Sequence, residues 1–206
     1  MDTETSDGGK RILEAAADLF SAQGFDAVSV QRIAEKANVC KATVFHHFPN
    51  KQALYLAVVK QACFNIGEVL ESLSEESCKS VKPLRAFAST HLMHLFEQEH
   101  IFRLVLREMT QGNEERGQAL AVEVFGDNFS RLMELIRIGQ KEGVLRADME
   151  AADAATAIVG LNVFLFESWS VLQHLPGTHF SSPERSGEKL LRLLLLGMIA
   201  RQDDTD

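Results

Sequence analysis

Residues 30–48 read VQRIAEKANVCKATVFHHF, which is the pattern of two short helices joined by a tight turn. Counted from Val30, the fifth residue is Ala34, which is small enough to let a second helix approach. The ninth is Asn38, a residue type that tolerates the left-handed backbone region. The remaining internal positions are apolar and would form a shared core: Ile33, Val39 and Val44. This spacing predicts a helix-turn-helix.

The second of these helices, predicted at 41–47, offers side chains that suit DNA. They are Lys41, Ala42, Thr43, Phe45, His46 and His47. Lys41 and Lys51 can neutralise phosphates, Thr43 can bond a phosphate or contact a thymine methyl group, and Ala42 allows close approach to a base edge. The alternative is a hairpin buried in a core, but a buried lysine and two histidines would be hard to satisfy. We therefore expect this segment to bind DNA.

Charge is distributed unevenly along the chain. The 206 residues carry a formal net charge of −8, which argues against a general coat for nucleic acid. Residues 28–62 hold five basic residues against one acid, Glu35, so their local charge is +4 and the other 171 residues carry −12. A small basic patch on an acidic body is typical of a protein that contacts phosphate at one place. A chance run of solvated lysines is the alternative.

Apolar residues recur with helical spacing nearly everywhere, so we predict an all-α fold of about nine helices. The ranges are 10–23, 30–37, 41–47, 51–73, 84–98, 100–110, 117–141, 150–174 and 185–201. We expect residues 1–9 to be flexible, 10–56 to form the DNA-binding domain and 57–206 to form a larger helical domain. The polar stretch near 74–82 would separate the head and its connecting helix from the body.

Composition excludes several classes of protein. Three cysteines (Cys40, Cys63 and Cys78) without CxxC spacing argue against a disulfide framework and favour a reducing cytoplasm. The sequence has no run of about eighteen apolar residues, as a membrane span needs, and its polar, acidic N-terminus is unlike a signal peptide. Motifs of serine hydrolases, P-loop and dinucleotide-binding enzymes and HExxH metalloproteases are missing. We expect a soluble cytoplasmic protein that is not an enzyme and has no cofactor.

Three motifs resemble the TetR family of bacterial transcription regulators. The first helix ends in FSAQGF (20–25), VxxIAEKAxV follows at 30–39, and KATVFHHFPNK stands at 41–51. The resemblance covers roughly residues 10–60. It implies a homodimeric repressor in which each subunit presents residues 41–47 to a major groove of a palindromic operator. It places the DNA contacts on Gln31, Lys41, Ala42, Thr43, Phe45, His47 and Lys51.

Three positions depart from the family pattern. Asn38 stands where the family has Gly or Ala, and Phe45 replaces a frequent Tyr whose hydroxyl would reach a phosphate. Cys40 replaces the usual Ser that caps the recognition helix. Because a thiol is a poor hydrogen-bond acceptor, we expect a weaker cap. DNA binding is still expected, with one fewer backbone contact.

The resemblance also implies a ligand pocket in the body of the protein. Thirteen Phe against one Tyr and one Trp favour a hydrophobic effector, such as an acyl chain or an aromatic compound. Candidate lining residues, with plain core as the alternative, are Met93, Phe96, Phe102, Met109, Phe125, Phe129 and Phe164. Effector binding would change the spacing of the two heads through helix 51–73, in which Gly67 is either a flexible point or a place of close packing.

The family's dimer interface lies on its last two long helices. Helix 150–174 is apolar nearly all round here, which suits burial between its own core and a partner subunit, and the last helix is similar. We predict a two-fold interface of four helices, with a monomer built on one thick core as the alternative. The predicted interface residues are Leu161, Leu165, Trp169, Leu191, Leu194, Leu195 and Met198.

Other readings of the chain remain open. His91, His94 and His100 in HLMHLFEQEH (91–100) are weak candidates for Zn²⁺ or Ni²⁺ ligands, and Cys40 at a positive helix end is a candidate redox switch. Arg107 and Glu108 are a candidate buried pair. A helical protein that binds other proteins or small molecules, with lost or non-specific DNA binding, is the alternative to a regulator, but it leaves the basic patch unexplained.

Overall fold

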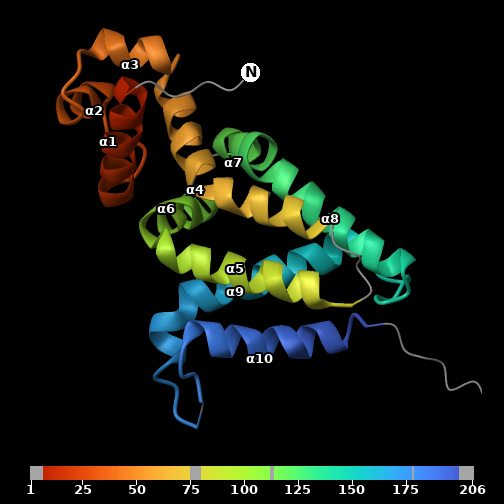
Figure 1. Ribbon diagram of the computed structural model, residues 1–206. Coiled ribbons are helices and arrows are strands. Elements are labelled where there is room, and N and C mark those ends of the chain that lie inside the picture. The colour runs from red at the N-terminus through yellow and green to blue at the C-terminus, as the bar shows by residue number, and fades with distance from the viewer. Residues whose placement is uncertain (1–6, 75–79, 112–113, 178, 200–206) are drawn as a thin grey trace, which may run out of the picture. The chain divides into compact units, whose positions relative to one another are not determined.

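The computed structural model describes residues 7–74, 80–111, 114–177 and 179–199, and it divides the chain into two compact units. The first unit comprises the described residues of Met1–Phe64 and Gln98–Phe125, and the second those of Asn65–Glu97 and Gly126–Asp206. The described residues form ten α-helices and one π-helical turn, with no β-strand among them (Figure 1). The predicted all-α class is confirmed.

The first unit contains the predicted helix-turn-helix. Its elements are α1 (Asp7–Gln23), α2 (Val30–Lys36), α3 (Lys41–His47), the start of α4 (Lys51–Ser74), α6 (Glu99–Gln111), α7 (Glu114–Leu120) and the π-helical turn Ala121–Phe125. Helix α1 contacts α2, α3 and α6 (Figure 1). It can do so because Ile12, Ala16 and Phe20 recur every four residues, lie on one face and are fully buried. Gly24 then ends the helix, with a φ of +83° and its N–H donating to the carbonyl of Phe20 at 2.7 Å.

The turn between α2 and α3 has the conformation that its sequence predicts. Asn38 has a φ of 53°, and among described residues other than glycine it alone has a positive φ. Val39 donates its N–H to the carbonyl of Ala34 at 3.0 Å, across the turn. Ile33, Ala34 and Val44 are at most 1% exposed and lie in the core as expected. Val39, the third apolar position predicted for this core, is only partly buried.

Side chains cap two of the three helices that build this region. Ser29 accepts from the N–H of Arg32 at 3.2 Å at the start of α2, and Asn50 accepts from the N–H of Ala53 at 2.8 Å at the start of α4. Cys40, at the start of α3, makes no such cap. Its thiol instead lies 3.1 Å from the hydroxyl of Thr43. The expected weak cap of the recognition helix is thus confirmed.

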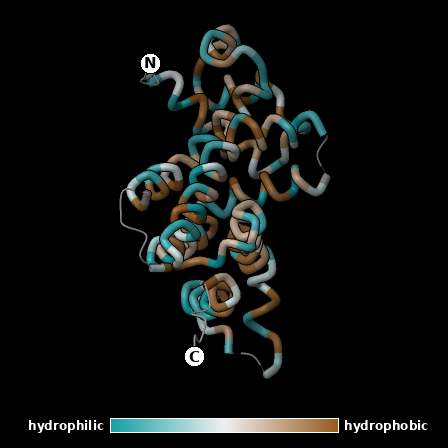
Figure 2. The backbone as a smooth tube through the Cα atoms, turned by 90° about the vertical axis from the view of Figure 1, so that its right-hand side faces the viewer, coloured by the Kyte–Doolittle hydropathy of each residue, from teal (hydrophilic) through white to brown (hydrophobic). Residues whose placement is uncertain are grey.

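The second unit is a bundle built from the end of α4 with α5 (Lys82–Glu97), α8 (Gly126–Lys141), α9 (Ala151–Leu172) and α10 (Pro183–Leu196). Helices α5, α9 and α10 contact one another, and α8 packs on α9 (Figure 1). Hydrophobic and hydrophilic residues alternate along the helices (Figure 2), as expected of helices with one buried face. The core includes Ile66, Leu84, Phe87, Leu132, Ile136, Ala155, Ile158, Leu191 and Leu195. At Gly67 an added Cβ would lie 3.0 Å from the amide oxygen of Asn128, so this glycine allows close packing.

The composition of the units differs from the predicted domains. We predicted a boundary at 56/57, but Gln98–Phe125 belongs to the first unit with Met1–Phe64, so the chain returns to the head after α5. The predicted helix 117–141 is also divided, by the π-helical turn Ala121–Phe125. Residues 1–6, 75–79 and 200–206 lie outside the described residues, and with them most of the predicted flexible N-terminus, part of the polar boundary and the end of the predicted helix 185–201.

Helix α9 is long and apolar enough to cross a membrane, although its sequence has no unbroken apolar run. Its buried residues lie in the core of the second unit, among them Ala155, Ile158 and Leu165. A core helix of a soluble protein can have the same length and composition, and α9 packs against α5, α8 and α10.

Replacing Cys40 by Ser tests the cap of α3. A serine hydroxyl can accept the N–H of Thr43, so Cys40→Ser should raise the free energy of unfolding by about 1 kcal/mol. Urea unfolding followed by circular dichroism would measure the change, with Cys40→Ala as the control that supplies no acceptor. Equal unfolding midpoints for the Ser and Ala variants would contradict the role of position 40.

Candidate DNA interface

Helix α3 presents most of the predicted DNA contacts to solvent. Lys41, Ala42 and His46 are exposed, while Thr43 and His47 are partly buried. Phe45 is 43% exposed, unusually high for a large apolar side chain, and the ammonium of Lys41 lies 5.8 Å from its ring centroid. Val44, by contrast, is 1% exposed and anchors the helix. One face of α3 is therefore fixed in the core and the other is free to meet a ligand.

The neighbouring basic side chains are partly committed to contacts with α1. Arg32 donates from Nη1 to Oε1 of Gln23 at 2.6 Å, and the ammonium of Lys36 lies 2.8 Å from Oδ2 of Asp18. Gln31, a predicted contact, is exposed and donates to Oε1 of Glu35 at 2.9 Å. The basic patch is thus smaller than its sequence charge implies, which leaves Lys41 and Lys51 as its main candidates for phosphate.

Lys51, at the start of α4, lies against the turn that follows α1. Its ammonium is 4.3 Å from the ring centroid of Phe25 and 3.4 Å from the carbonyl oxygen of Asp26. Partial burial lowers the pKa of Lys51, Asp26 opposes that shift and the nearby Arg116 adds to it. These contacts with Phe25 and Asp26 restrict the side chain of Lys51, the predicted phosphate-binding lysine.

Sequence reasoning missed the residues that hold this turn. Arg116 on α7 lies with its guanidinium carbon 4.7 Å from the Phe25 centroid, donates from Nε to Oε1 of Glu108 at 2.5 Å, and reaches Oδ2 of Asp26 at 3.5 Å. Glu108 is thus paired with Arg116, and not with Arg107, its candidate partner in the sequence. Adjacent residues of a helix do not face each other, and Arg107 lies instead beside Gly24. The only indication of this pair in the sequence is that Glu108 and Arg116 are eight residues apart.

Cys40 is exposed and its thiol pKa is lowered, mainly by the hydrogen bond with the side chain of Thr43. The candidate redox residue thus sits beside a candidate DNA contact. Cys63, on α4, is buried, and burial raises its pKa to about 12. The third cysteine, Cys78, lies outside the described residues.

The predicted effector-lining residues fall in both units. Phe102, Met109 and Phe125 belong to the first unit, and Met93, Phe96, Phe129 and Phe164 to the second. Met109 is 66% exposed and Phe164 is 56% exposed, so neither is enclosed in its unit. Phe96 is partly buried and meets Phe166 and Trp169 edge-on, with ring centroids 5.3 and 6.3 Å apart. The prediction that these residues line an effector pocket stays a prediction.

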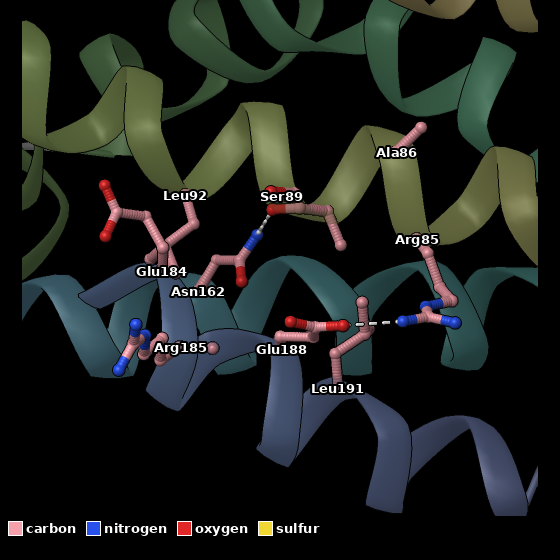
Figure 3. A pocket seen from close by; sticks show the side chains of 11 residues that line it. Arg85, Ala86, Ser89, Leu92, Asn162, Glu184, Arg185, Glu188 and Leu191 are labelled. Carbon is pink, nitrogen blue, oxygen red and sulfur yellow. Dashed lines mark hydrogen bonds and ion pairs between the residues drawn. The ribbon is translucent and has the colours of Figure 1, made fainter. Parts of the chain in front are cut away.

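A cavity of about 360 Å³ opens between α5, α9 and α10 of the second unit, and none of the predicted lining residues borders it (Figure 3). Asn162 lies at its base, 2% exposed, and donates to the carbonyl of Ala88 at 2.8 Å. Arg85 and Glu188 face each other across it at 2.7 Å. The lining is mixed, because these charged and polar groups stand beside Leu92 and Leu191.

Four of the predicted interface residues pack in the protomer's own core. Leu165, Leu191, Leu195 and Met198 are at most 5% exposed within one protomer. Leu161, Trp169 and Leu194 are partly buried. The apolar side chains that remain exposed on the same helices are Phe164 and Val171 on α9, and Leu193 and Leu196 on α10. The residues predicted to face a partner thus include four that face the protomer's own core.

The histidines of the 91–100 segment do not converge. His91 stacks on Phe87 at 5.5 Å and its Nδ1 lies 3.0 Å from the amide nitrogen of Asn162. Burial, with a smaller effect of His94, lowers the pKa of His91 to about 4. His94 is buried near Glu97, and His100 is exposed. Within the described ranges, no group of three or more His, Cys, Asp or Glu side chains is placed to hold a metal ion.

Two family descriptions match this chain. "Bacterial regulatory proteins, tetR family" matches residues 12–58, and "Tetracyclin repressor-like, C-terminal domain" matches residues 81–193. Among relatives, an uncharacterised HTH-type transcriptional regulator of Bacillus subtilis, YvkB, is 33% identical over 118 residues. That alignment spans 54% of this chain and 62% of YvkB.

Solved structures share the fold over nearly the whole chain. FadR of Bacillus subtilis, solved in complex with stearoyl-CoA, has a TM-score of 0.76 at 21% identity, over 91% of this chain and 98% of that chain. SmeT, the repressor of the Stenotrophomonas maltophilia multidrug efflux pump SmeDEF, has a TM-score of 0.71 at 22% identity, over 94% and 91%. With the two matches that together cover its helix-turn-helix and its helical body, the chain belongs to the TetR family of helix-turn-helix transcriptional regulators.

Proposed function

We propose that the protein is a cytoplasmic repressor that binds a palindromic operator as a homodimer and is released by a small hydrophobic effector. The proposed DNA binding is supported most directly by the two faces of α3. Val44 on one face is buried, while Lys41, Ala42 and His46 are exposed. A short helix anchored on one side and polar on the other suits the major groove.

The exposed residues divide into two roles. Lys41 and Lys51 would neutralise phosphates and fix the register of the protein on the duplex. Ala42, Thr43, His46 and His47 would read base edges, and the exposed ring of Phe45 suits apolar contact with a thymine methyl group. Gln31, at the start of α2, would contact the backbone beside them.

Dimerisation through α9 and α10 is the second part of the proposal. Phe164 and Val171 are seven residues apart and share one face of α9, while Leu193 and Leu196 share one face of α10. These four side chains stay 56% to 66% exposed, and exposed apolar patches are typical of interaction surfaces. The same two helices of a second copy would cover them in a two-fold interface.

The effector is the least specified part of the proposal. A hydrophobic compound is supported by the abundance of Phe and by the fold shared with FadR, whose structure holds stearoyl-CoA. Effector binding would favour a spacing of the two recognition helices that no longer matches successive major grooves, about 34–36 Å apart.

A selection of genomic fragments tests the function directly. The purified protein should retain a small set of fragments that share a palindrome, and stearoyl-CoA should release them while coenzyme A alone should not. Retention without a shared motif would mean non-specific phosphate binding only, and would contradict the proposed repressor. Release by neither compound would overturn the acyl effector alone.

Lys51→Ala tests the phosphate contact. The variant should weaken binding to the selected operator and to random duplexes alike, by about tenfold, because a charge-assisted hydrogen bond is lost. The slope of log K against log salt should fall by about one. Lys60→Ala, an exposed lysine further along α4, is the matched control. An unchanged affinity and slope in Lys51→Ala would refute the contact.

Phe164→Glu and Leu193→Glu test the interface. Each places a charge on the proposed contact and should raise the dimer dissociation constant at least roughly 30-fold, as for a central interface residue. Sedimentation velocity would measure the change. Val122→Glu is the matched control, since Val122 is 70% exposed but lies on the π-helical turn. Sedimentation of all three variants as the parent dimer would exclude this face.

A further inference from the structure

The Phe25 ring, in the turn after α1, carries two cations. The ammonium of Lys51 lies 4.3 Å from its centroid and the guanidinium carbon of Arg116 lies 4.7 Å from it. The ring also meets Tyr55 edge-on at 5.2 Å and stacks with Phe20 at 5.7 Å, and both of these residues are fully buried. Phe25 is thus held by the core of the first unit while its face holds the side chain that we assign to a DNA phosphate.

Arg116 is itself held by two carboxylates of the same unit. Its pair with Glu108 is buried, with the two side chains 13% and 8% exposed, and its contact with Asp26 reaches the residue next to Phe25. The backbone of this turn also meets Lys51, because the carbonyl oxygen of Asp26 accepts from its ammonium at 3.4 Å. Arg116 and Lys51 therefore contact the same two residues. Arg116 contacts the ring of Phe25 and the carboxylate of Asp26. Lys51 contacts the ring of Phe25 and the backbone carbonyl of Asp26.

We propose that Arg116, which lies on α7 and outside the helix-turn-helix, is a positioning residue for DNA binding. Through Phe25 and Asp26 it fixes the surface on which the ammonium of Lys51 rests, and so determines where that ammonium meets a phosphate. The inference rests on the proposed role of Lys51 in phosphate binding. Helix α7 would thus contribute to operator affinity without contacting DNA.

The charges around the ring explain why Arg116 needs Glu108. Two cations near one ring repel each other, and Arg116 contributes to lowering the pKa of Lys51. The buried carboxylate of Glu108 neutralises Arg116, which leaves Lys51 to be balanced by Asp26 and, when bound, by a phosphate. Removing Arg116 alone would leave the Glu108 carboxylate buried without this partner, a change that destabilises proteins strongly.

The test therefore uses a double exchange that leaves no unpaired charge. Glu108→Gln with Arg116→Gln removes both charges together. Asp26→Asn separately weakens the exposed contact with Arg116, and it also removes a negative charge near Lys51. The matched control is Glu99→Gln with Arg103→Gln, an ion pair of 2.7 Å on α6 of the same unit. Thermal unfolding of all variants shows which of them keep the fold, and Asp26→Asn supplies the measurement if the double exchange does not.

Operator affinity is then measured with and without Lys51→Ala in each background. The Glu108/Arg116 exchange should weaken binding about fivefold, within the range of coupling energies for residues of one network. Lys51→Ala should then cost far less in the exchanged protein than in the parent, since its ammonium is already misplaced. Equal losses in both backgrounds, or parent affinity in the exchanged protein, would overturn the inference.

A second measurement does not depend on DNA. Reductive methylation of lysines, carried out at a pH at which Lys41, Lys51 and Lys60 are deprotonated to the same extent and followed by mass spectrometry, reports how accessible each amine is. Lys51 should react several-fold more slowly than Lys41 and Lys60 in the parent, and at their rate in the exchanged protein but not in the control. Slow methylation of Lys51 in every variant would overturn the inference even if the operator is found. Loss of the operator with the expected methylation pattern would instead count against the proposed function alone.

Discussion

Helices α2 and α3 have seven residues each, far fewer than an isolated helix needs to persist in water. Their existence depends on burying Ile33, Ala34 and Val44 against α1. The surface that we propose reads DNA is therefore a product of tertiary packing rather than of helix propensity. Its outward side chains can vary freely as long as the inward ones are kept, which is how one fold can serve many operators.

The parts of this structure that were predictable from the sequence are those set by local backbone chemistry. Asn38 could be assigned a left-handed conformation because few residue types tolerate one, and the missing cap at Cys40 follows from the weakness of a thiol acceptor. The caps of α2 and α4 are likewise local, because Ser29 and Asn50 are residue types whose side-chain oxygens favour the N-cap position. In each case the information lies within four residues of the position.

Features set by contacts distant in sequence were not predictable. Helix α9 is apolar nearly all round, so its sequence could not show that Leu165 faces the core while Phe164 faces outward. The pairing of Glu108 with Arg116, and of both with the turn at Phe25, depends on the return of residues 98–125 to the first unit. The apolar periodicity within α6 and α7 does not indicate which unit these helices belong to. Whether the candidate site residues contact DNA or an effector depends in turn on molecules that the chain does not encode.

The thiol at the start of α3 has a consequence beyond the fold. Cysteine and serine codons differ by one nucleotide, so the cap of the recognition helix can be gained or lost in a single mutational step. Because that cap lies outside the side chains proposed to read bases, such a step would change how firmly the helix is formed while the proposed base contacts stay the same. Position 40 therefore gives evolution a way to adjust the strength of regulation separately from its target.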